Sequence, residues 1–187
     1  MLYKAISESL VAIGGFTEQE ISLITNRLET KRIEKDQFVL QHGEICQSVL
    51  FVKSGTLHQY KMVGDMDQLM LNLYPENSWV MDHKSFTSQK PSENYIQATE
   101  DSKVQELTMN TIHELISQTP SFFKLGKILD LVQHDQHGID HLKSPEEKYL
   151  KLLDTRPELL QKFPLKSIAS YLRMTPETLS RVRRKIV

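Results

Sequence analysis

Two stretches near the start of the chain have apolar residues at helical spacing. The first stretch stops before Gly14-Gly15 and places these residues on one helical face: Leu2, Ile6, Leu10 and Ile13. Thr17 and Glu20 form a capping box ahead of the second stretch, which predicts a helix over about residues 17–28. We therefore expect two amphipathic helices before the pattern changes.

From about Lys31 to Thr108 the chain consists of short runs rich in β-branched, aromatic and leucine residues. Turn-forming residues separate the runs at intervals of roughly ten residues. The best strand candidates are residues 38–40, 49–52, 56–62, 68–74 and 95–98. This rhythm predicts an antiparallel β-roll or barrel.

After Pro120 the helical period returns with apolar residues at alternating steps of three and four. The positions are Phe122, Leu125, Leu129, Val132 and Ile139, with the polar Gln136 among them. A heptad pattern of this kind is typical of a two-stranded coiled coil. It predicts a long dimerisation helix over residues 120–143, with the five apolar residues at the interface of a homodimer.

The last part of the chain has the pattern of two short helices joined by a tight turn. The apolar stripe of the first helix is Ile168, Ala169 and Leu172, and that of the second is Leu179, Val182 and Ile186. Thr175 is a good N-cap, and Pro176 suits the first helical position. The spacing predicts a helix-turn-helix.

The outer face of the second helix is polar and basic. From Lys162 to Val187 the net charge is +6, whereas the whole chain is −1 and the remainder therefore −7. A basic module of this kind is typical of phosphate binding, although a solvated charged face is the alternative. We predict base contacts for Glu177, Ser180 and Arg181 and phosphate contacts for Lys166, Ser167, Thr175, Arg183 and Arg184.

Composition narrows the class of protein. With 187 residues, 39% hydrophobic and 25% charged, the chain can form two domains, and we expect an α+β fold divided at residues 1–119, 120–143 and 144–187. Cys46 is the single cysteine, which excludes an internal disulfide and an iron–sulfur cluster ligated by four cysteines of this chain. No signal peptide, membrane span or catalytic motif is apparent, so we expect a cytoplasmic protein that is not an enzyme and has no cofactor or metal.

The order of these elements resembles the Crp/Fnr family of transcription regulators. Gly43-Glu44 followed by residues 50–57 is similar to the signature of the family's roll, and residues 168–181 are similar to its DNA-reading element. The resemblance implies a cyclic-nucleotide-binding-like sensor roll, a homodimer on double-stranded DNA, RNA polymerase as a further partner, and a small-molecule effector of unknown identity. In the oxygen-responsive branch, residues at the positions of Glu177, Ser180 and Arg181 contact bases, which implies a half-site similar to TTGA.

Several positions depart from the family pattern. Members that bind a cyclic nucleotide have Gly-Glu and then Arg in the phosphate-binding turn, where this chain has Met81-Asp82 and Ser92. Without the arginine, Asp82 should repel a cyclic phosphate. Arg173 stands where glycine is usual, and a left-handed backbone there would cost about 1–2 kcal/mol. The sequence given ends at Val187, so we do not expect within it the β-hairpin wing that many members have.

Single residues allow more than one interpretation. His134, His137 and His141 could bind a metal along one helix face, but an outward-facing solvated position is the favoured interpretation. Cys46 is expected to be a buried small hydrophobe rather than a regulatory thiol. Trp79, Met81 and Phe86 could line a ligand cavity in the roll, with Asp82 and Ser92 as further candidates for a ligand pocket, although core packing is the favoured role of Trp79, Met81 and Phe86.

The leading hypothesis is a dimeric, sequence-specific DNA-binding regulator of the Crp/Fnr type. The alternative is a ligand-binding or protein-interaction module whose terminal helices do not bind DNA. Salt dependence distinguishes them, because the affinity of a phosphate-binding protein for DNA falls steeply with salt.

Overall fold

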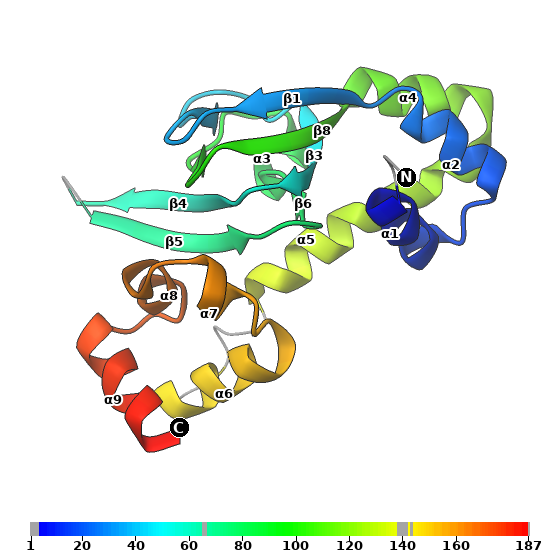
Figure 1. The fold of residues 1–187 in the computed structure, drawn as a ribbon. Helices are drawn as coiled ribbons and strands as arrows, with labels where there is room; N and C mark the ends of the chain where they lie inside the picture. Colours follow the sequence, from blue (N-terminus) through cyan, green and yellow to red (C-terminus); the bar gives the residue numbers. More distant parts are fainter. Residues whose placement is uncertain (1–3, 65–66, 138–141, 143, 187) are drawn as a thin grey trace.

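The computed structural model describes residues 4–64, 67–137, 142 and 144–186 of the chain. A β-roll with helices at one end forms the first part, and α5 leads from it to a helical domain (Figure 1). The strands are β1 (Glu29–Ile33), β2 (Phe38–Leu40), β3 (Ser48–Ser54), β4 (Leu57–Val63), β5 (Asp67–Tyr74), β6 (Trp79–Val80), β7 (Tyr95–Ala98) and β8 (Ser102–Thr108). The helices are α1 (Lys4–Gly14), α2 (Glu18–Thr25), α3 (His83–Ser88), α4 (Met109–Gln118), the 3-10 helix η1 (Pro120–Gly126), α5 (Lys127–His137), α6 (Pro145–Thr155), α7 (Leu159–Lys162), α8 (Leu165–Tyr171) and α9 (Pro176–Ile186).

The strands form two antiparallel sheets with the orders β1-β8-β3-β6 and β2-β7-β4-β5. Val52 and Val104 of the first sheet and Leu57 and Ile96 of the second are almost fully buried in one core. Burial of these β-branched and leucine side chains between two sheets is the main source of the roll's stability. The α+β fold with an antiparallel roll is therefore confirmed.

The turn between β3 and β4 requires glycine at position 55. Gly55 has a φ of +86°, and a Cβ atom there would lie 2.7 Å from the backbone of Ser102 and 2.8 Å from the carbonyl oxygen of Asp101. Glycine alone adopts this backbone readily without a clash. The close approach joins the β3–β4 turn to the start of β8.

The N-terminal helices lie close to their predicted positions, although α2 ends at Thr25, before the predicted end near residue 28. The side chain of Thr17 accepts a hydrogen bond from the Glu20 N–H, and Glu20 accepts one from the Thr17 N–H, so the predicted capping box begins α2. The Glu20 carboxylate also accepts a hydrogen bond from the hydroxyl of Ser121. This contact attaches α2 to η1.

The predicted coiled-coil seam requires a correction. Residues 120–126 form a 3-10 helix, and α5 begins at Lys127. Phe122, Leu125 and Val132 are only 0–3% exposed and belong to the core of the single chain. They therefore cannot form a dimer interface in this fold. Leu129 is half-buried against the same core, and Ile139 lies outside the described residues.

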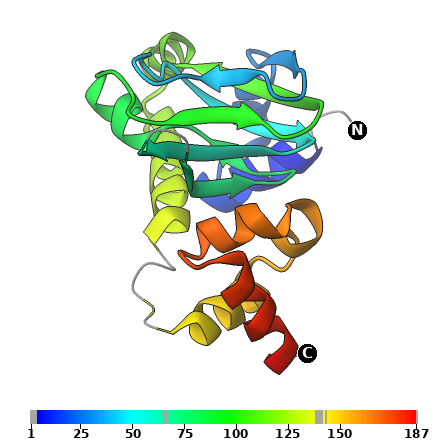
Figure 2. The same ribbon diagram turned by 90° about the vertical axis from the view of Figure 1, so that its left-hand side faces the viewer.

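The helical domain lies below the roll, with α8 directly beneath β4 and β5 (Figure 2). Helices α6, α7, α8 and α9 contribute Leu152, Leu159, Ile168 and Leu179 to a core that also includes residues of β4 and β5. The Ser144 hydroxyl and the Glu147 carboxylate form a capping box that begins α6. Among the described residues, none of the helices has the length and apolarity needed to span a bilayer.

Candidate DNA-binding interface

Helices α8 and α9 pack against each other through the predicted apolar stripes. Ala169, Leu172 and Leu179 are fully buried, and the small Ala169 side chain lies in the domain core. The Met174 N–H donates to the Ala169 carbonyl at 3.0 Å, which closes the turn between the helices. This is the geometry of a helix-turn-helix.

The turn contains the backbone conformation that usually requires glycine. Arg173 has a φ of +59°, in the left-handed region. Thr175 then caps α9, because its hydroxyl accepts a hydrogen bond from the Thr178 N–H at 3.2 Å. The cap and Pro176 fix the start of α9 as the sequence predicts.

The predicted base-contacting residues share the outer face of α9. Glu177 and Arg181 are exposed and Ser180 is half-buried. Hydrogen bonds from its own backbone N–H and from the Thr175 hydroxyl lower the pKa of the Glu177 carboxyl, which keeps it ionised and able to accept. In the described part of the chain, Arg181 and Glu177 do not form an ion pair, so the helix-stabilising alternative is not observed.

The predicted phosphate-contacting residues surround this face. Lys166, Thr175, Arg183 and Arg184 are exposed, and Ser167 is half-buried near the start of α8. The hydroxyl of Thr175 already takes part in the α9 cap. Lys185 pairs with Glu146 at 3.2 Å and so connects α9 to α6.

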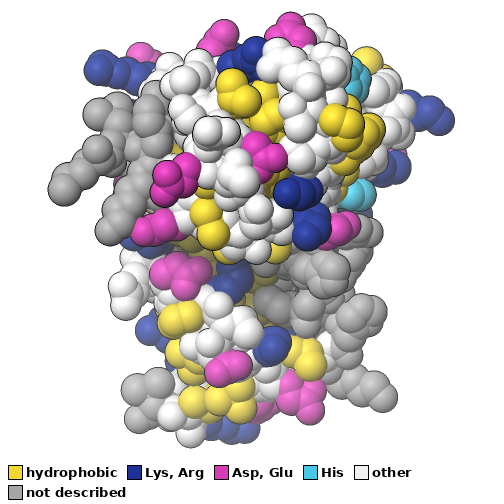
Figure 3. All heavy atoms as spheres, turned by 90° about the vertical axis from the view of Figure 1, so that its right-hand side faces the viewer, with side chains coloured by type: hydrophobic (Ala, Val, Ile, Leu, Met, Phe, Trp, Pro, Cys, Tyr) yellow, Lys and Arg dark blue, Asp and Glu magenta, His cyan; other side chains and the backbone are white. Residues whose placement is uncertain are grey.

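Positive charge is not gathered in one patch on the face of the molecule that Figure 3 shows. Over the face seen in Figure 3, which looks onto α2, basic and acidic side chains are interspersed. The excess of basic residues in the sequence falls on α8, the turn and α9. Electrostatic attraction of an anionic partner is favoured where such an excess of positive charge lies.

The predicted ligand pocket of the roll is occupied by a network around Asp82. One carboxylate oxygen caps α3 by accepting a hydrogen bond from the Ser85 N–H at 2.9 Å. The other oxygen accepts from Ser92 at 2.8 Å, Asn94 at 2.7 Å and Gln59 at 3.3 Å. Asp82 is 2% exposed, so this corner of the roll contains a buried carboxyl group whose hydrogen-bonding capacity is used within the chain.

Trp79 and Met81 have different surroundings. Trp79 packs edge-on against Phe51 at 5.0 Å between ring centroids, and its indole N–H donates to Ser9 at 2.8 Å. It is a core residue that attaches α1 to the roll, so it does not line the pocket with Asp82. Met81 lines a cavity of about 490 Å³ together with Cys46.

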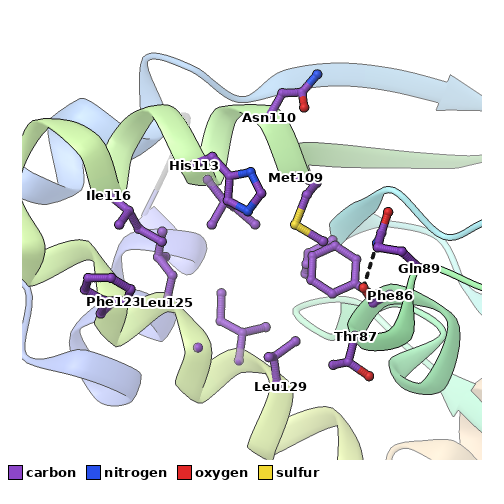
Figure 4. Close-up of a pocket in the computed structure, with 14 residues that line it drawn as sticks. Phe86, Thr87, Gln89, Met109, Asn110, His113, Ile116, Phe123, Leu125 and Leu129 are labelled. Atoms are coloured by element: carbon purple, nitrogen blue, oxygen red, sulfur yellow. Dashed lines mark hydrogen bonds between the residues drawn. The ribbon is translucent and has the colours of Figure 1, made fainter.

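A larger pocket, not predicted from the sequence, lies between α3, α4 and α5 (Figure 4). Its volume is about 630 Å³. Met109, Ile116 and Leu129 supply apolar surface, and His113 and Gln89 supply polar groups. Its residues come from distant segments, so no local pattern in the sequence could reveal it.

Comparison with known proteins agrees with the two-part architecture. The family model of the cyclic nucleotide-binding domain matches residues 30–119. FixK2 from Bradyrhizobium japonicum is similar in structure, with a TM-score of 0.69 and 15% identity over 85% of this chain and 84% of that one. The regulator CLP of Xanthomonas campestris has a TM-score of 0.66 and 15% identity over 91% of each chain. The catabolite activator protein of Thermus thermophilus has a TM-score of 0.58 and 17% identity over 95% of this chain and 85% of that one. A search of curated proteins finds no match.

Residues 30–119, which contain nearly all of the β-roll, match the cyclic nucleotide-binding domain. The fold continues beyond that domain into the helical domain, and as a whole it is similar to the folds of FixK2, CLP and the catabolite activator protein.

Proposed function

We propose that the protein is a homodimeric transcription regulator that binds specific DNA sequences. The observation that carries the proposal is α9, which buries Leu179 and Val182 and exposes Glu177 and Arg181. A helix held by its apolar face, with a polar and basic outer face, is suited to the major groove.

The residue chemistry on α9 supports sequence reading. A guanidinium such as that of Arg181 can donate two hydrogen bonds to guanine O6 and N7, and the carboxylate of Glu177 can accept from cytosine N4 or adenine N6. Ser180 adds a short contact between them. The proposed phosphate contacts, which fix the register on the duplex, are Lys166, Ser167, Thr175, Arg183 and Arg184. RNA polymerase is a further proposed partner. A regulator of this kind would act in the cytoplasm.

Dimerisation is proposed through the exposed apolar side chains that follow α4. Phe123 is 68% exposed and Leu131 is 47% exposed, in contrast to the buried Phe122 and Val132. Exposed large apolar groups on adjoining helices favour an interface. Leu129, half-buried nearby, and Ile139 remain predicted members of it. A two-fold axis through this region would present two copies of α9 to one DNA duplex.

The roll is proposed to sense something other than a cyclic nucleotide bound in the usual mode. The buried Asp82 carboxylate occupies the corner aligned with the phosphate-binding turn, and burying a second negative charge beside it is unfavourable. The apolar pocket of Figure 4 has the size and lining suited to a small apolar molecule with one polar group, and α5 leads from it toward the helical domain.

An electrophoretic titration of DNA against salt tests the DNA-binding proposal. A sequence-selective complex whose affinity falls steeply with salt supports it. A flat or absent response supports the alternative of a ligand-binding or protein-interaction module.

A further inference from the structure

The edge of strand β5 is bonded to side chains of the helical domain. β5 is the last strand in the order β2-β7-β4-β5, so one of its edges has no neighbouring strand in the sheet. The Ser170 hydroxyl of α8 accepts a hydrogen bond from the Met70 N–H at 3.0 Å and donates to the Gln68 carbonyl at 3.2 Å. A serine from the helix-turn-helix thus takes the place of a neighbouring strand.

Two arginines add to this contact. Arg173 donates to the carbonyl oxygen of Met70, and to that of Ser170 at 3.2 Å. Arg156, at the end of α6, donates to the Asn72 side chain at 3.1 Å and to the Leu73 carbonyl at 2.7 Å. Guanidinium groups form strong hydrogen bonds of this kind. We call Arg156, Ser170 and Arg173 the β5 clamp.

Apolar packing accompanies the clamp. Tyr60, Met70 and Leu73 of the roll are at most 5% exposed and belong to the same cluster as Ile168 and Tyr171 of α8. The view in Figure 2 shows α8 lying along the underside of β4 and β5. Domains with a buried, hydrogen-bonded interface have little freedom to reorient.

The clamp leaves the reading surface free. Ser170 and Arg173 lie on α8 and the turn, whereas Glu177 and Arg181 on α9 remain exposed. DNA can therefore contact α9 while the clamp stays closed. Because α8 and the turn are attached to the roll, the direction of α9 is fixed relative to the roll and α5.

We propose that Arg156, Ser170 and Arg173 are positioning residues that fix the orientation of α9 in each protomer and so set the half-site spacing that the dimer accepts. This inference rests on the proposed DNA-binding function. The clamp also explains why an arginine, Arg173, occupies a turn position with a left-handed backbone conformation. The side chain that replaces glycine holds the helix-turn-helix on β5.

The test uses the full-length protein and the variant Arg173→Gly combined with Ser170→Ala. Glycine adopts the positive φ of the turn readily, so the helix-turn-helix keeps its conformation while two of the three clamp side chains are lost and Arg156 remains. Thr155→Ala is the matched control, because that hydroxyl donates to the Lys151 carbonyl within α6. Inverted half-sites obtained by selection with the parent protein are then presented at a series of spacings.

The proposal predicts faster hydrogen exchange at the Met70 amide, a loss of about tenfold in affinity at the best spacing, and a broader spacing preference. Affinity for a single half-site should be unchanged. Arg173→Lys with Ser170 intact should retain much of the preference.

An unchanged spacing profile, or an unchanged Met70 exchange rate, in the double variant contradicts the positioning role. A rise in affinity at the best spacing also contradicts it, because the clamp would then oppose DNA binding. If the parent protein selects no sequence, the DNA-binding proposal itself fails and the positioning role falls with it. If the parent protein does select a sequence and a spacing, and the variant prefers the same spacing, only the positioning role fails.

Discussion

Asp82 changes what the roll can bind. Its two carboxylate oxygens accept hydrogen bonds from Ser85, Ser92, Asn94 and Gln59, so they are already bonded within the chain. A cyclic phosphate entering there would lie beside the Asp82 carboxylate, and the ammonium group of Lys84, which interacts with Asp82, is already paired with Glu93 at 2.7 Å.

We therefore expect no binding of cyclic AMP or cyclic GMP at physiological concentrations. Isothermal calorimetry of the folded protein with each nucleotide should show no saturable heat. A micromolar affinity for either nucleotide would mean that another residue supplies the charge, and the interpretation of Asp82 would be wrong.

Cys46 is a buried thiol, as the sequence predicts. It is 6% exposed, and burial raises its pKa to about 11. An unfolded chain loses the thiol proton at a pKa near 9, so between these values the native state binds more protons than the unfolded state. The contribution of this group to stability is therefore fully present below about pH 9 and is lost as the pH rises toward 11.

The measurement is the free energy of unfolding of the parent minus that of Cys46→Ala, followed with pH. This difference should be constant near neutral pH and fall by about 2 kcal/mol by pH 11. A difference that stays constant over that range would show that the thiol ionises normally. The reactivity of the native thiol at neutral pH should likewise be low.

At the scale of the element, the sequence pattern of η1 and α5 is compatible with two different structures. Apolar residues at steps of three and four fit a coiled coil, but they equally fit a helix that packs on its own core. Phe122 stacks on Phe16 with 6.3 Å between the ring centroids. The contact forms only in the folded chain, where the segment between α1 and α2 packs against η1, so the local pattern does not predict it. The exposed residues, Phe123 and Leu131, lie off the heptad positions.

Substitution can separate the residues of the proposed dimer interface from those of the core. Phe123→Asp with Leu131→Asp should give a folded monomer, because charge is placed on the proposed interface and leaves the core intact. Val132→Asp should instead unfold the protein, since burying an unpaired carboxylate costs several kcal/mol. Sedimentation and thermal denaturation measure the two outcomes. A double variant that remains dimeric removes this face from the interface.

The helix-turn-helix was predictable because its signals are local. The stripe spacing, the Thr175 cap and Pro176 all lie within a few residues of one another. Strand β1 was not predicted, because its sequence Glu-Thr-Lys-Arg-Ile contains one buried residue and its partner β8 lies far along the chain. Edge strands with mostly exposed side chains lack the alternation that marks a strand.

At the scale of the whole molecule, the relation between the roll and the helical domain could not be predicted. Ser170 bonds to the Met70 N–H across 100 residues of chain, and no periodicity encodes such a contact. The sequence does contain one indication of it, the arginine at a position where the turn favours glycine. Only the fold shows that this arginine reaches β5.

The central claim is that α9 reads DNA through Arg181, and selection from randomised DNA with matched variants tests it most directly. Arg181→Ala should cost about 1–3 kcal/mol on the preferred site and relax the preference for guanine. Arg183→Ala, the control at a proposed phosphate contact, should weaken all sequences alike and reduce the salt slope by about one. An i,i+4 pair with Glu177 would contribute only about 0.2–0.5 kcal/mol and no sequence preference. If Arg181→Ala returns the parent's motif at the parent's strength, the base-reading role of α9 is contradicted.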